Sequence, residues 1–392
     1  MVARFVEDPV SAGGSSAPFR VAEGGRIDRA TSLGFVFDGK RYSGHAGDTL
    51  ASALIANGVR LIGRSFKYHR RRGIVAAGAE EPNALVQLET GARTEPNLRA
   101  TQIALYDGLI ASSQNCWPSV EFDIGAINDF LSRVLPAGFY YKTFMWPASR
   151  WMLYERLIKR AAGLGRAPVE ADSDRYAHRH IHCDVLVAGA GPAGLAAALS
   201  AARGGARVIL VDESSEAGGQ LLGDSAKVDG SDALLWVREV ISELSTLPDV
   251  RVLLRSQVAA IWDHGMASVI EQVGRGGPVA AHLPRQRLWK VRAREIVVAT
   301  GALERAIAFG NNDLPGVMLA GAARTYLNRY AAQAGRRAVV FTNNDSAYHA
   351  ALDLQRSGVA ISAIVDVRAQ LTGSAPLAAL AAGITVLPGH AV

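Results

Sequence analysis

Cys183-Asp-Val-Leu-Val-Ala-Gly189-Ala-Gly191-Pro-Ala-Gly194 is the stretch of this sequence that decides its fold. A short apolar run typical of a buried parallel strand leads into three glycines spaced G-x-G-x-x-G, and an alanine-rich helical segment follows. A second apolar run, 208–211, then ends in an acid. Strand, glycine turn, helix, strand and acid in this order predict a Rossmann-type α/β unit that binds a dinucleotide. The alternative is a glycine-rich turn without a ligand.

Each part of this motif has a physical task. Gly189 would allow the tight turn, Gly191 would let the backbone approach a pyrophosphate, and Gly194 would let helix and strand pack closely. The phosphates would sit at the start of the helix, where unpaired N–H groups and the helix dipole favour negative charge. Asp212 would then accept a hydrogen bond from a ribose hydroxyl.

The composition suits a large α/β protein. At roughly 150 residues per domain, the 392 residues predict two or three domains. The two cysteines, Cys116 and Cys183, are too few for a disulfide framework or for a four-thiolate iron–sulfur cluster. Neither a signal peptide nor a membrane-spanning apolar run is visible, so we expect a cytoplasmic protein that does not insert into a membrane. The net charge of +6 is a small excess of 42 basic over 36 acidic residues.

The first hundred residues predict a flexible arm followed by a small α+β unit. Residues 1–25 are rich in Gly, Ser and Ala, which is typical of a mobile arm. The run Phe35-Val-Phe-Asp-Gly-Lys-Arg-Tyr42 predicts a hairpin with an Asp-Gly turn. A helix should follow over 51–56, with Asp48 or Thr49 as its N-cap and Asn57-Gly58 at its end.

The stretch from Gly47 to Asn83, which includes Arg64-Ser-Phe-Lys-Tyr-His-Arg-Arg-Arg72, resembles the N-terminal domain of sarcosine oxidase alpha subunits. That domain is similar to a plant-type [2Fe-2S] ferredoxin. Cluster-bearing relatives have cysteines near position 65 and around 77–81, where this chain has none. The resemblance therefore implies a ferredoxin-like domain without an iron–sulfur cluster, kept as scaffold and interface.

The basic run 64–72 has three interpretations: an interface or internal ion pairing, a solvated surface, or a nucleic-acid patch. Glu80 and Glu81 follow closely and offer partners for the arginines. We favour internal pairing or an interface and expect no nucleic acid as partner, because a charge run without a binding fold is weak evidence.

An aromatic-rich connector leads to the glycine turn. Aromatic residues gather over 136–147, and apolar residues recur at helical spacing over 151–163, which predicts packing between domains or subunits. His178, His180 and His182 alternate on one face of an extended segment. No pattern of carboxylate or thiol partners with ligand spacing accompanies them, so we expect a polar linker and no metal site.

Three later segments resemble parts of glutathione-reductase-like flavoproteins. Gly218-Gly-Gln-Leu221 would pass close to the cofactor, the strand containing Val258 would end over the adenine, and the turn at Thr300-Gly301 would close the nucleotide cleft. The complete set of predicted cofactor-binding residues is Gly189, Gly191, Pro192, Ala193, Gly194, Asp212, Glu213, Gly219, Gln220, Val258, Thr300 and Gly301.

The C-terminal part again resembles the sarcosine oxidase alpha subunit over 309–330. Residues 337–366 begin a second strand-turn-helix unit, but Asn343-Asn-Asp-Ser346 stands where its glycines would lie. Because side chains there keep a pyrophosphate away, we expect no second dinucleotide. The sequence stops just after a predicted strand, and the family continues into a folate-binding domain, so we expect a fragment.

The expected domains are a flexible arm (1–25), a cluster-free ferredoxin-like domain (26–110), a helical connector (111–180), a dinucleotide-binding domain (181–335) and an incomplete, degenerate Rossmann-like domain (336–392). The resemblance implies a subunit of an oxidoreductase complex that demethylates sarcosine to glycine, a formaldehyde-level carbon and hydrogen peroxide.

The same resemblance implies a beta subunit and smaller subunits as partners. FAD and FMN would lie in the partner or at the subunit boundary, and this chain would carry NAD, with FAD as the alternative. The motif alone does not separate the two dinucleotides, and no catalytic residue is visible in the chain. One rival is a subunit of an amine, opine or cyanide-forming dehydrogenase, disfavoured because those subunits often keep cluster cysteines. Another is a non-catalytic scaffold stabilised by its nucleotide.

Overall fold

We analysed a computed structural model that describes residues 1–5, 17–133, 146–161, 163, 165–274, 277, 279–280 and 282–392. The chain forms two compact units. The first combines residues 1–172 with 304–392, and the second is the intervening segment 173–303. The second unit thus lies within the sequence of the first, and it contains the glycine turn.

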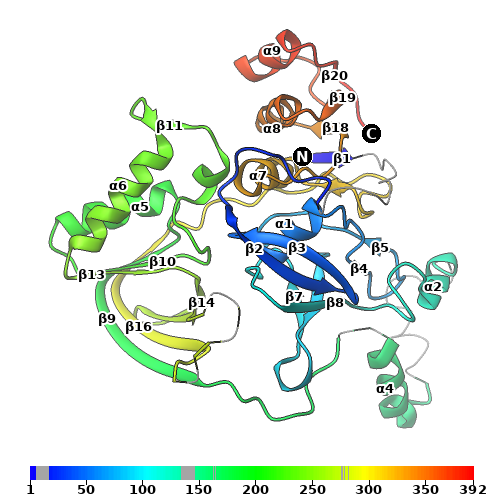
Figure 1. Ribbon diagram of the computed structural model, residues 1–392, viewed down its shortest axis with the longest axis horizontal. Coiled ribbons are helices and arrows are strands. Elements are labelled where there is room, and N and C mark those ends of the chain that lie inside the picture. Colours follow the sequence, from blue (N-terminus) through cyan, green and yellow to red (C-terminus); the bar gives the residue numbers. More distant parts are fainter. Residues whose placement is uncertain are drawn as a thin grey trace. The chain divides into compact units, whose positions relative to one another are not determined.

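The second unit is built on one six-stranded sheet with the order β13-β10-β9-β16-β15-β14. Its strands are β9 (Tyr176–Ala188), β10 (Val208–Val211), β13 (Val250–Leu253), β14 (Ser256–Trp262), β15 (Met266–Gln272) and β16 (Gln286–Val298). The first four in the order are parallel, whereas β16, β15 and β14 pair antiparallel. Figure 1 shows the long strands β9 and β16 running side by side.

The two faces of this sheet have separate cores. Helices α5 (Pro192–Arg203) and α6 (Ala233–Thr246) cover one face, where Val187, Leu210 and helical residues such as Leu195 pack together. On the other face Leu186, Ile209 and Val211 pack against side chains of β15 and β16. Alternation of side chains along each strand sends neighbouring residues to opposite cores, as expected for a strand that is buried on both faces. The remaining elements of this unit are β11 (Lys227–Val228), β12 (Ser231–Asp232) and the 3-10 helix η4 (Gly219–Gly223).

The first unit contains a mixed sheet with the order β3-β2-β8-β6-β7. Its strands are β2 (Asp28–Phe37), β3 (Lys40–Ala46), β6 (Leu85–Leu88), β7 (Glu95–Arg99) and β8 (Leu109–Ser113). The predicted hairpin is confirmed, because β2 and β3 pair antiparallel around Asp38 and Gly39, both at positive φ. The predicted helix is α1 (Leu50–Ala56), and Thr49 is its N-cap in a capping box with Ser52.

A second sheet of this unit has the order β17-β1-β18-β19-β20. Its strands are β1 (Val2–Phe5), β17 (Val317–Met318), β18 (Arg337–Thr342), β19 (Ala360–Asp366) and β20 (Val386–Pro388). The helices of this part are α7 (Ala320–Tyr330), α8 (Ser346–Arg356) and α9 (Ser374–Ala381).

The position of β1 corrects the expectation of a flexible arm over 1–25. This strand pairs with both β17 and β18, and Ala3 is fully buried. Phe19 is also buried, and Arg20 forms a bridge with Ala332. The segment between these anchors is rich in glycine, serine and alanine, and that composition hid two short pieces that pack into the fold.

The other short elements of the first unit are β4 (Gly63–Arg64), β5 (Arg71–Arg72), η1 (Gly91–Arg93), η2 (Ile124–Ala126), α2 (Ile127–Phe130), η3 (Ala148–Arg150) and α4 (Trp151–Ala161). The helix expected from the spacing after Trp151 is confirmed as α4. Most of the aromatic segment 136–147 lies outside the described residues. Within the described part of the chain, no helix combines the length and the apolar character needed to cross a membrane.

The basic run 64–72 is largely paired within the first unit, which confirms internal pairing, but with partners other than the two expected glutamates. Arg70 donates to both carboxylate oxygens of Asp313, at 2.8 and 2.9 Å, and Arg72 also donates to this carboxylate. The strong hydrogen bond from Arg70 holds the pKa of Asp313 below its usual value. A carboxyl group whose pKa is lowered by folding stabilises the folded protein at pH values above its pKa in the unfolded chain. This stabilisation is lost as the pH falls through the pKa of the group in the folded protein.

We therefore expect Asp313→Asn to reduce the free energy of unfolding at pH 7 by about 1 kcal/mol, a modest value because the pair is partly exposed. The difference from the unchanged protein should shrink below about pH 5, where Asp313 in the unfolded chain becomes protonated. Urea unfolding between pH 7 and pH 3 measures it. Asp129→Asn is the control, since Asp129 lies 3.4 Å from Arg70 and is more exposed. A difference that stays constant with pH would contradict this role.

Glu81 is almost fully buried and closes the loop 75–84 on itself. Its carboxylate accepts hydrogen bonds from the backbone N–H groups of Val75, Ala76, Asn83 and Ala84, at 2.6 to 2.9 Å. Four donors that converge on one carboxylate fix the path of the loop, because each would otherwise be a buried polar group without a partner.

Glu81→Gln places an amide NH2 where two of these donors point, so both lose their acceptor. We expect the free energy of unfolding to fall by about 2 kcal/mol, since hydrogen bonds to charged groups contribute about 1.5–3 kcal/mol. Thermal unfolding of Glu81→Gln beside Glu80→Gln, a less buried neighbour, measures the difference. Equal midpoints for the two variants would show that the four contacts contribute little.

Candidate functional site

The glycine turn forms the centre of the candidate site, at the carboxyl end of β9. Gly189 has a φ of +104°, and a Cβ atom built there would meet the carbonyl oxygen of Ala299 at 2.3 Å. A Cβ at Gly194 would meet the carbonyl oxygen of Gly189 at 1.8 Å. Both positions therefore require glycine, the first for its backbone conformation and the second for the contact between helix and turn.

Gly191 differs from these two, because a Cβ there would have no closer neighbour than the Cα of Gly219 at 4.0 Å. It has extended backbone angles and is the N-cap of α5, whose first residue is Pro192. The first N–H groups of a helix lack partners within the helix, so the space above Gly191 and Ala193 is suited to an anion. A helix start whose N-cap carries no side chain is the arrangement on which a pyrophosphate binds in folds of this type.

Asp212 has a role that the sequence did not reveal. Its carboxylate accepts a hydrogen bond from the N–H of Ala190 at 2.6 Å and another from the N–H of Ser214 at 2.7 Å. The side chain thus braces the glycine turn against the end of β10. Each carboxylate oxygen keeps a further lone pair that could accept from a ribose hydroxyl. The predicted contact with a ribose is thus compatible with these two hydrogen bonds, and it stays a prediction. Asp212 lies at the end of β10 as expected, whereas Glu213 beside it is exposed.

The structure brings several other predicted residues to this turn. A Cβ built on Gly219 would lie 2.9 Å from the Cα of Gly191, and Thr300 follows the Ala299 that contacts Gly189. The N–H of Ser256 donates to the carbonyl of Asp212, so the start of β14 also lies here. Val258 is two residues further along and packs against the core of the sheet instead. Gln220 and Gly301 are exposed, and no contact places them at the turn.

In the second strand-turn-helix unit, charged side chains lie at the turn where the first unit has glycines. Asp366 ends β19 and is fully buried, and it accepts hydrogen bonds from Arg368 and from the hydroxyl of Tyr348. Arg368 also lies 2.8 Å from Asp345, the residue before α8. These ion pairs occupy the turn, and the expectation that no dinucleotide binds there stays a prediction.

The histidines and cysteines offer neither a metal site nor a reactive thiol in the part of the chain that the structure describes. His178, His180 and His182 are exposed on β9, and in this part no three His, Cys, Asp or Glu side chains are grouped to hold a metal ion. Cys116 and Cys183 are free thiols. Burial raises the pKa of Cys183 to about 11, so this thiol is a poor nucleophile at neutral pH.

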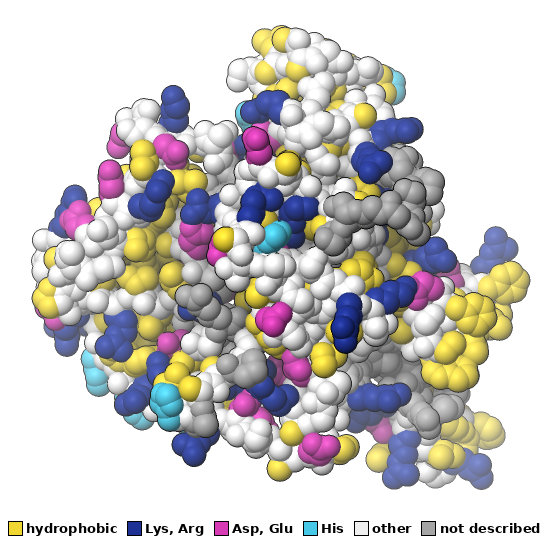
Figure 2. Space-filling view, viewed as in Figure 1, with side chains coloured by type: hydrophobic (Ala, Val, Ile, Leu, Met, Phe, Trp, Pro, Cys, Tyr) yellow, Lys and Arg dark blue, Asp and Glu magenta, His cyan; other side chains and the backbone are white. Residues whose placement is uncertain are grey.

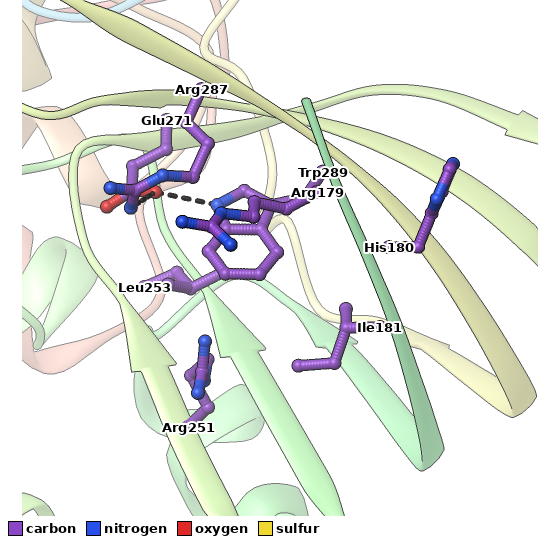
Figure 3. Close-up of a pocket in the computed structure, with 8 residues that line it drawn as sticks. All are labelled: Arg179, His180, Ile181, Arg251, Leu253, Glu271, Arg287 and Trp289. Carbon is purple, nitrogen blue, oxygen red and sulfur yellow. Dashed lines mark hydrogen bonds and ion pairs between the residues drawn. The ribbon is translucent and has the colours of Figure 1, made fainter. Parts of the chain in front are cut away.

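A cavity of about 570 Å³ lies on the other face of the same sheet and shares no lining residue with the glycine turn. Its lining comes from β9, β13, β15 and β16: Arg179, His180, Ile181, Arg251, Leu253, Glu271, Arg287 and Trp289 (Figure 3). The sequence alone did not reveal this cavity. The pattern that could have indicated the cavity is an arginine two residues before an apolar residue. It occurs on three strands, at positions 179 and 181, 251 and 253, and 287 and 289.

An exposed apolar surface lies over α2 and the loop before it, and Figure 2 shows hydrophobic side chains gathered there. Its members are Trp117, Phe122, Ile124, Ile127, Phe130 and Leu131. The loop is firmly held, because the buried Asp123 accepts from the N–H groups of Trp117 and Gly125 and contacts His69 at 2.6 Å. Apolar side chains displayed on a fixed frame are typical of an interaction surface.

Family models match two parts of the chain. Residues 184–314 match a model described as FAD dependent oxidoreductase, and residues 30–116 match one described as a 2Fe-2S iron-sulfur cluster binding domain. The chain therefore has an α/β fold of Rossmann type, of the kind found in FAD-dependent oxidoreductases.

The sarcosine oxidase subunit alpha of Rhizobium meliloti (strain 1021) is 55% identical over 352 residues, or 89% of this chain. That of Corynebacterium sp. (strain P-1) is 39% identical over 379 residues, or 96% of this chain. The chain spans 36% and 34% of these two relatives, about a third of their length. The crystal structure of L-proline dehydrogenase from P.horikoshii covers 91% of this chain and 57% of its own, with a TM-score of 0.60 at 20% identity, and supports the fold alone.

These matches correct two expectations about cofactors. The FAD-type model contradicts the expectation that the dinucleotide of this chain is NAD. The match of residues 30–116 to a cluster-binding domain contradicts the expectation that the chain lacks an iron–sulfur centre.

The residues present fit the two groups unequally. The glycine turn has what a dinucleotide needs: Gly191 carries no side chain, and α5 begins directly after it. A [2Fe-2S] cluster of this type uses four thiolates, and Cys116 is the one cysteine that the sequence has within 30–116. The cysteines of this chain do not supply that set.

Proposed function

We propose that this homologue of the sarcosine oxidase alpha subunit is the FAD-holding part of an oxidoreductase complex that demethylates sarcosine to glycine. The carbon would leave at the formaldehyde level, and oxygen would be reduced to hydrogen peroxide. The observation that carries the proposal is the intact glycine turn, where Gly189 and Gly194 admit no side chain and Gly191 places none before the start of α5. Identity of 55% over most of the chain supports the choice of family.

The residues of the turn would each have a defined task toward FAD. The helix start after Gly191 would bind the pyrophosphate through backbone N–H groups. Asp212, which already accepts hydrogen bonds from two backbone N–H groups, would also accept one from a ribose hydroxyl. Thr300, beside the contact between Gly189 and Ala299, would close the other side of the cleft. FAD, when bound, supplies the capacity to accept a hydride, while the protein binds and orients it.

We assign residues 28–113 to a ferredoxin-like arrangement that serves as scaffold and interface. The family match over 30–116 and the mixed sheet β3-β2-β8-β6-β7 support this assignment. We also place the protein in the cytoplasm. Two free cysteines are compatible with a reducing compartment.

The partners in this proposal are a beta subunit and smaller subunits of one hetero-oligomer. The relatives are named as subunits, which supports an assembly. The exposed apolar surface from Trp117 to Leu131, with Phe130 87% exposed, is the kind of area that a permanent subunit contact covers. The catalytic groups would come from other subunits of the complex, since the described residues of this chain form no recognisable binding site for an amine substrate.

Two measurements on the natively co-purified protein test the proposal. Denaturation should release a ligand with a flavin absorption spectrum; a ligand that absorbs only as an adenine would exclude FAD from this site. The intact complex should release peroxide with sarcosine. Dimethylglycine and proline are the comparison substrates, and no peroxide with any of the three would overturn the proposed reaction.

A further inference from the structure

The cavity between β9, β13, β15 and β16 carries an excess of positive charge. Arg179, Arg251 and Arg287 line it, and Glu271 is its one acidic lining residue. One oxygen of Glu271 accepts from Arg287 at 2.7 Å and from the indole N–H of Trp289 at 2.6 Å (Figure 3). Glu271 therefore neutralises one guanidinium, and two positive charges remain.

Two of these guanidinium groups, those of Arg251 and Arg287, lie near the ring of Trp289. Trp289 is 6% exposed, and its ring centroid lies 5.2 Å from the guanidinium carbon of Arg251 and 5.5 Å from that of Arg287. Cation–π attraction holds both groups near the ring, and the hydrogen bond to Glu271 fixes the indole. The arrangement is thus prepared before any ligand arrives, which reduces the entropy cost of binding.

Arg287 has an unused donor. Its Nε atom is buried and has no hydrogen-bond partner among the described residues. A buried donor without an acceptor is costly, and an incoming oxyanion that reaches this nitrogen would satisfy it. The planar guanidinium groups match carboxylate and phosphate oxygens, to which they can donate two parallel hydrogen bonds.

We propose that this cavity binds a small organic anion, with a carboxylate or phosphate group held by Arg179, Arg251 and Arg287. The apolar part of the ligand would rest on Ile181 and Leu253, which also line the cavity. A volume of about 570 Å³ suits a small molecule, since such sites span roughly 300–1,000 Å³. Because Arg179 and Arg251 are exposed, the ligand reaches the cavity from solvent.

Titration calorimetry on the full chain tests this site with two probes, inorganic phosphate and glutarate. We expect at least one probe to bind, and the stronger probe identifies the anionic group. The double variant Arg179→Gln, Arg251→Gln should weaken that binding at least tenfold. Both side chains are exposed and only one cation–π contact is lost, so the unfolding midpoint should change little. No binding of either probe, or equal affinity in the double variant, would overturn the proposal.

Two control variants test whether the anion binds in this cavity or at another place on the chain. Arg292→Gln removes a positive charge from an exposed position on the same strand, β16, outside the lining of the cavity, and should leave binding unchanged. Gly191→Val alters the glycine turn and should also leave binding unchanged, whatever dinucleotide the turn holds. Loss of binding in either control would place the anion elsewhere and refute the assignment.

Discussion

Replacing Gly191 with valine should lower the affinity for the dinucleotide at least 100-fold without unfolding the protein. A Cβ there meets no atom outside the neighbouring residues closer than the Cα of Gly219, at 4.0 Å, so we expect the free protein to accept the side chain. It fills the space that the pyrophosphate needs and keeps the phosphates from the first N–H groups of α5. A factor of 100 corresponds to about 2.7 kcal/mol.

The measurement is the dinucleotide content of the purified variant, followed by titration with the ligand that the unchanged protein releases. Gly310→Val is the matched control, since Gly310 also has open space around its Cβ position and no positive φ. Normal content in the Gly191 variant would show that the ligand, if any, binds away from this turn. The rival role as a scaffold predicts loss of assembly together with the nucleotide, whereas a redox role predicts loss of turnover in complexes that still assemble.

Replacing Arg20 with methionine should lower the free energy of unfolding by about 3–5 kcal/mol, because it leaves a buried carboxylate without its cation. The carboxylate of Asp48 is fully buried and accepts from both terminal nitrogens of Arg20, at 3.1 and 2.7 Å. The same guanidinium donates to the backbone carbonyl of Tyr330 at the end of α7. One side chain thereby joins the start of α1 to the helix that follows β17.

Chemical denaturation of the single variant and of the double variant Arg20→Met, Asp48→Asn tests this interpretation. The double variant should lose less than the sum of the two single changes, because removing both charges leaves no unpaired ion. Lys40, which lies 3.8 Å from Glu121 in an exposed pair, is the control: Lys40→Met should change the free energy of unfolding by less than about 1 kcal/mol. Additive losses would mean that Arg20 and Asp48 contribute independently.

The dinucleotide unit was predictable because its signals are local. Apolar runs, glycines and a terminal acid stand within thirty residues of one another, and each constrains the backbone directly. The Asp38-Gly39 turn and the Thr49 cap were predictable for the same reason. What remained hidden depends on pairing across long distances. Neither the partner of Arg70, 243 residues away, nor the place of β1 leaves a trace in neighbouring residues.

The functional residues divide in the same way. Gly191 and Asp212 were identified because the motif fixes their spacing, but the contact of Asp212 with Ala190 depends on how β10 meets the turn. The cavity around Trp289 brings together four strands that span more than a hundred residues, so its arginines looked like ordinary surface charges. The basic run was correctly interpreted as paired, yet the expected glutamates were wrong, because Glu81 is occupied by backbone donors.

The pairing of β1 with β18 also sets an order of events during synthesis. Ala3 faces Val340 in the sheet, so this strand leaves the ribosome long before its partner exists. At about 5–20 residues per second the wait is roughly 15–70 s. The complete unit 173–303 emerges within that interval and can bury its own two cores first. Until β18 has been synthesised, the segment Val2–Phe5 is an unpaired strand with exposed apolar side chains on the nascent chain. Chaperones that bind such segments would have the longest time to bind this one.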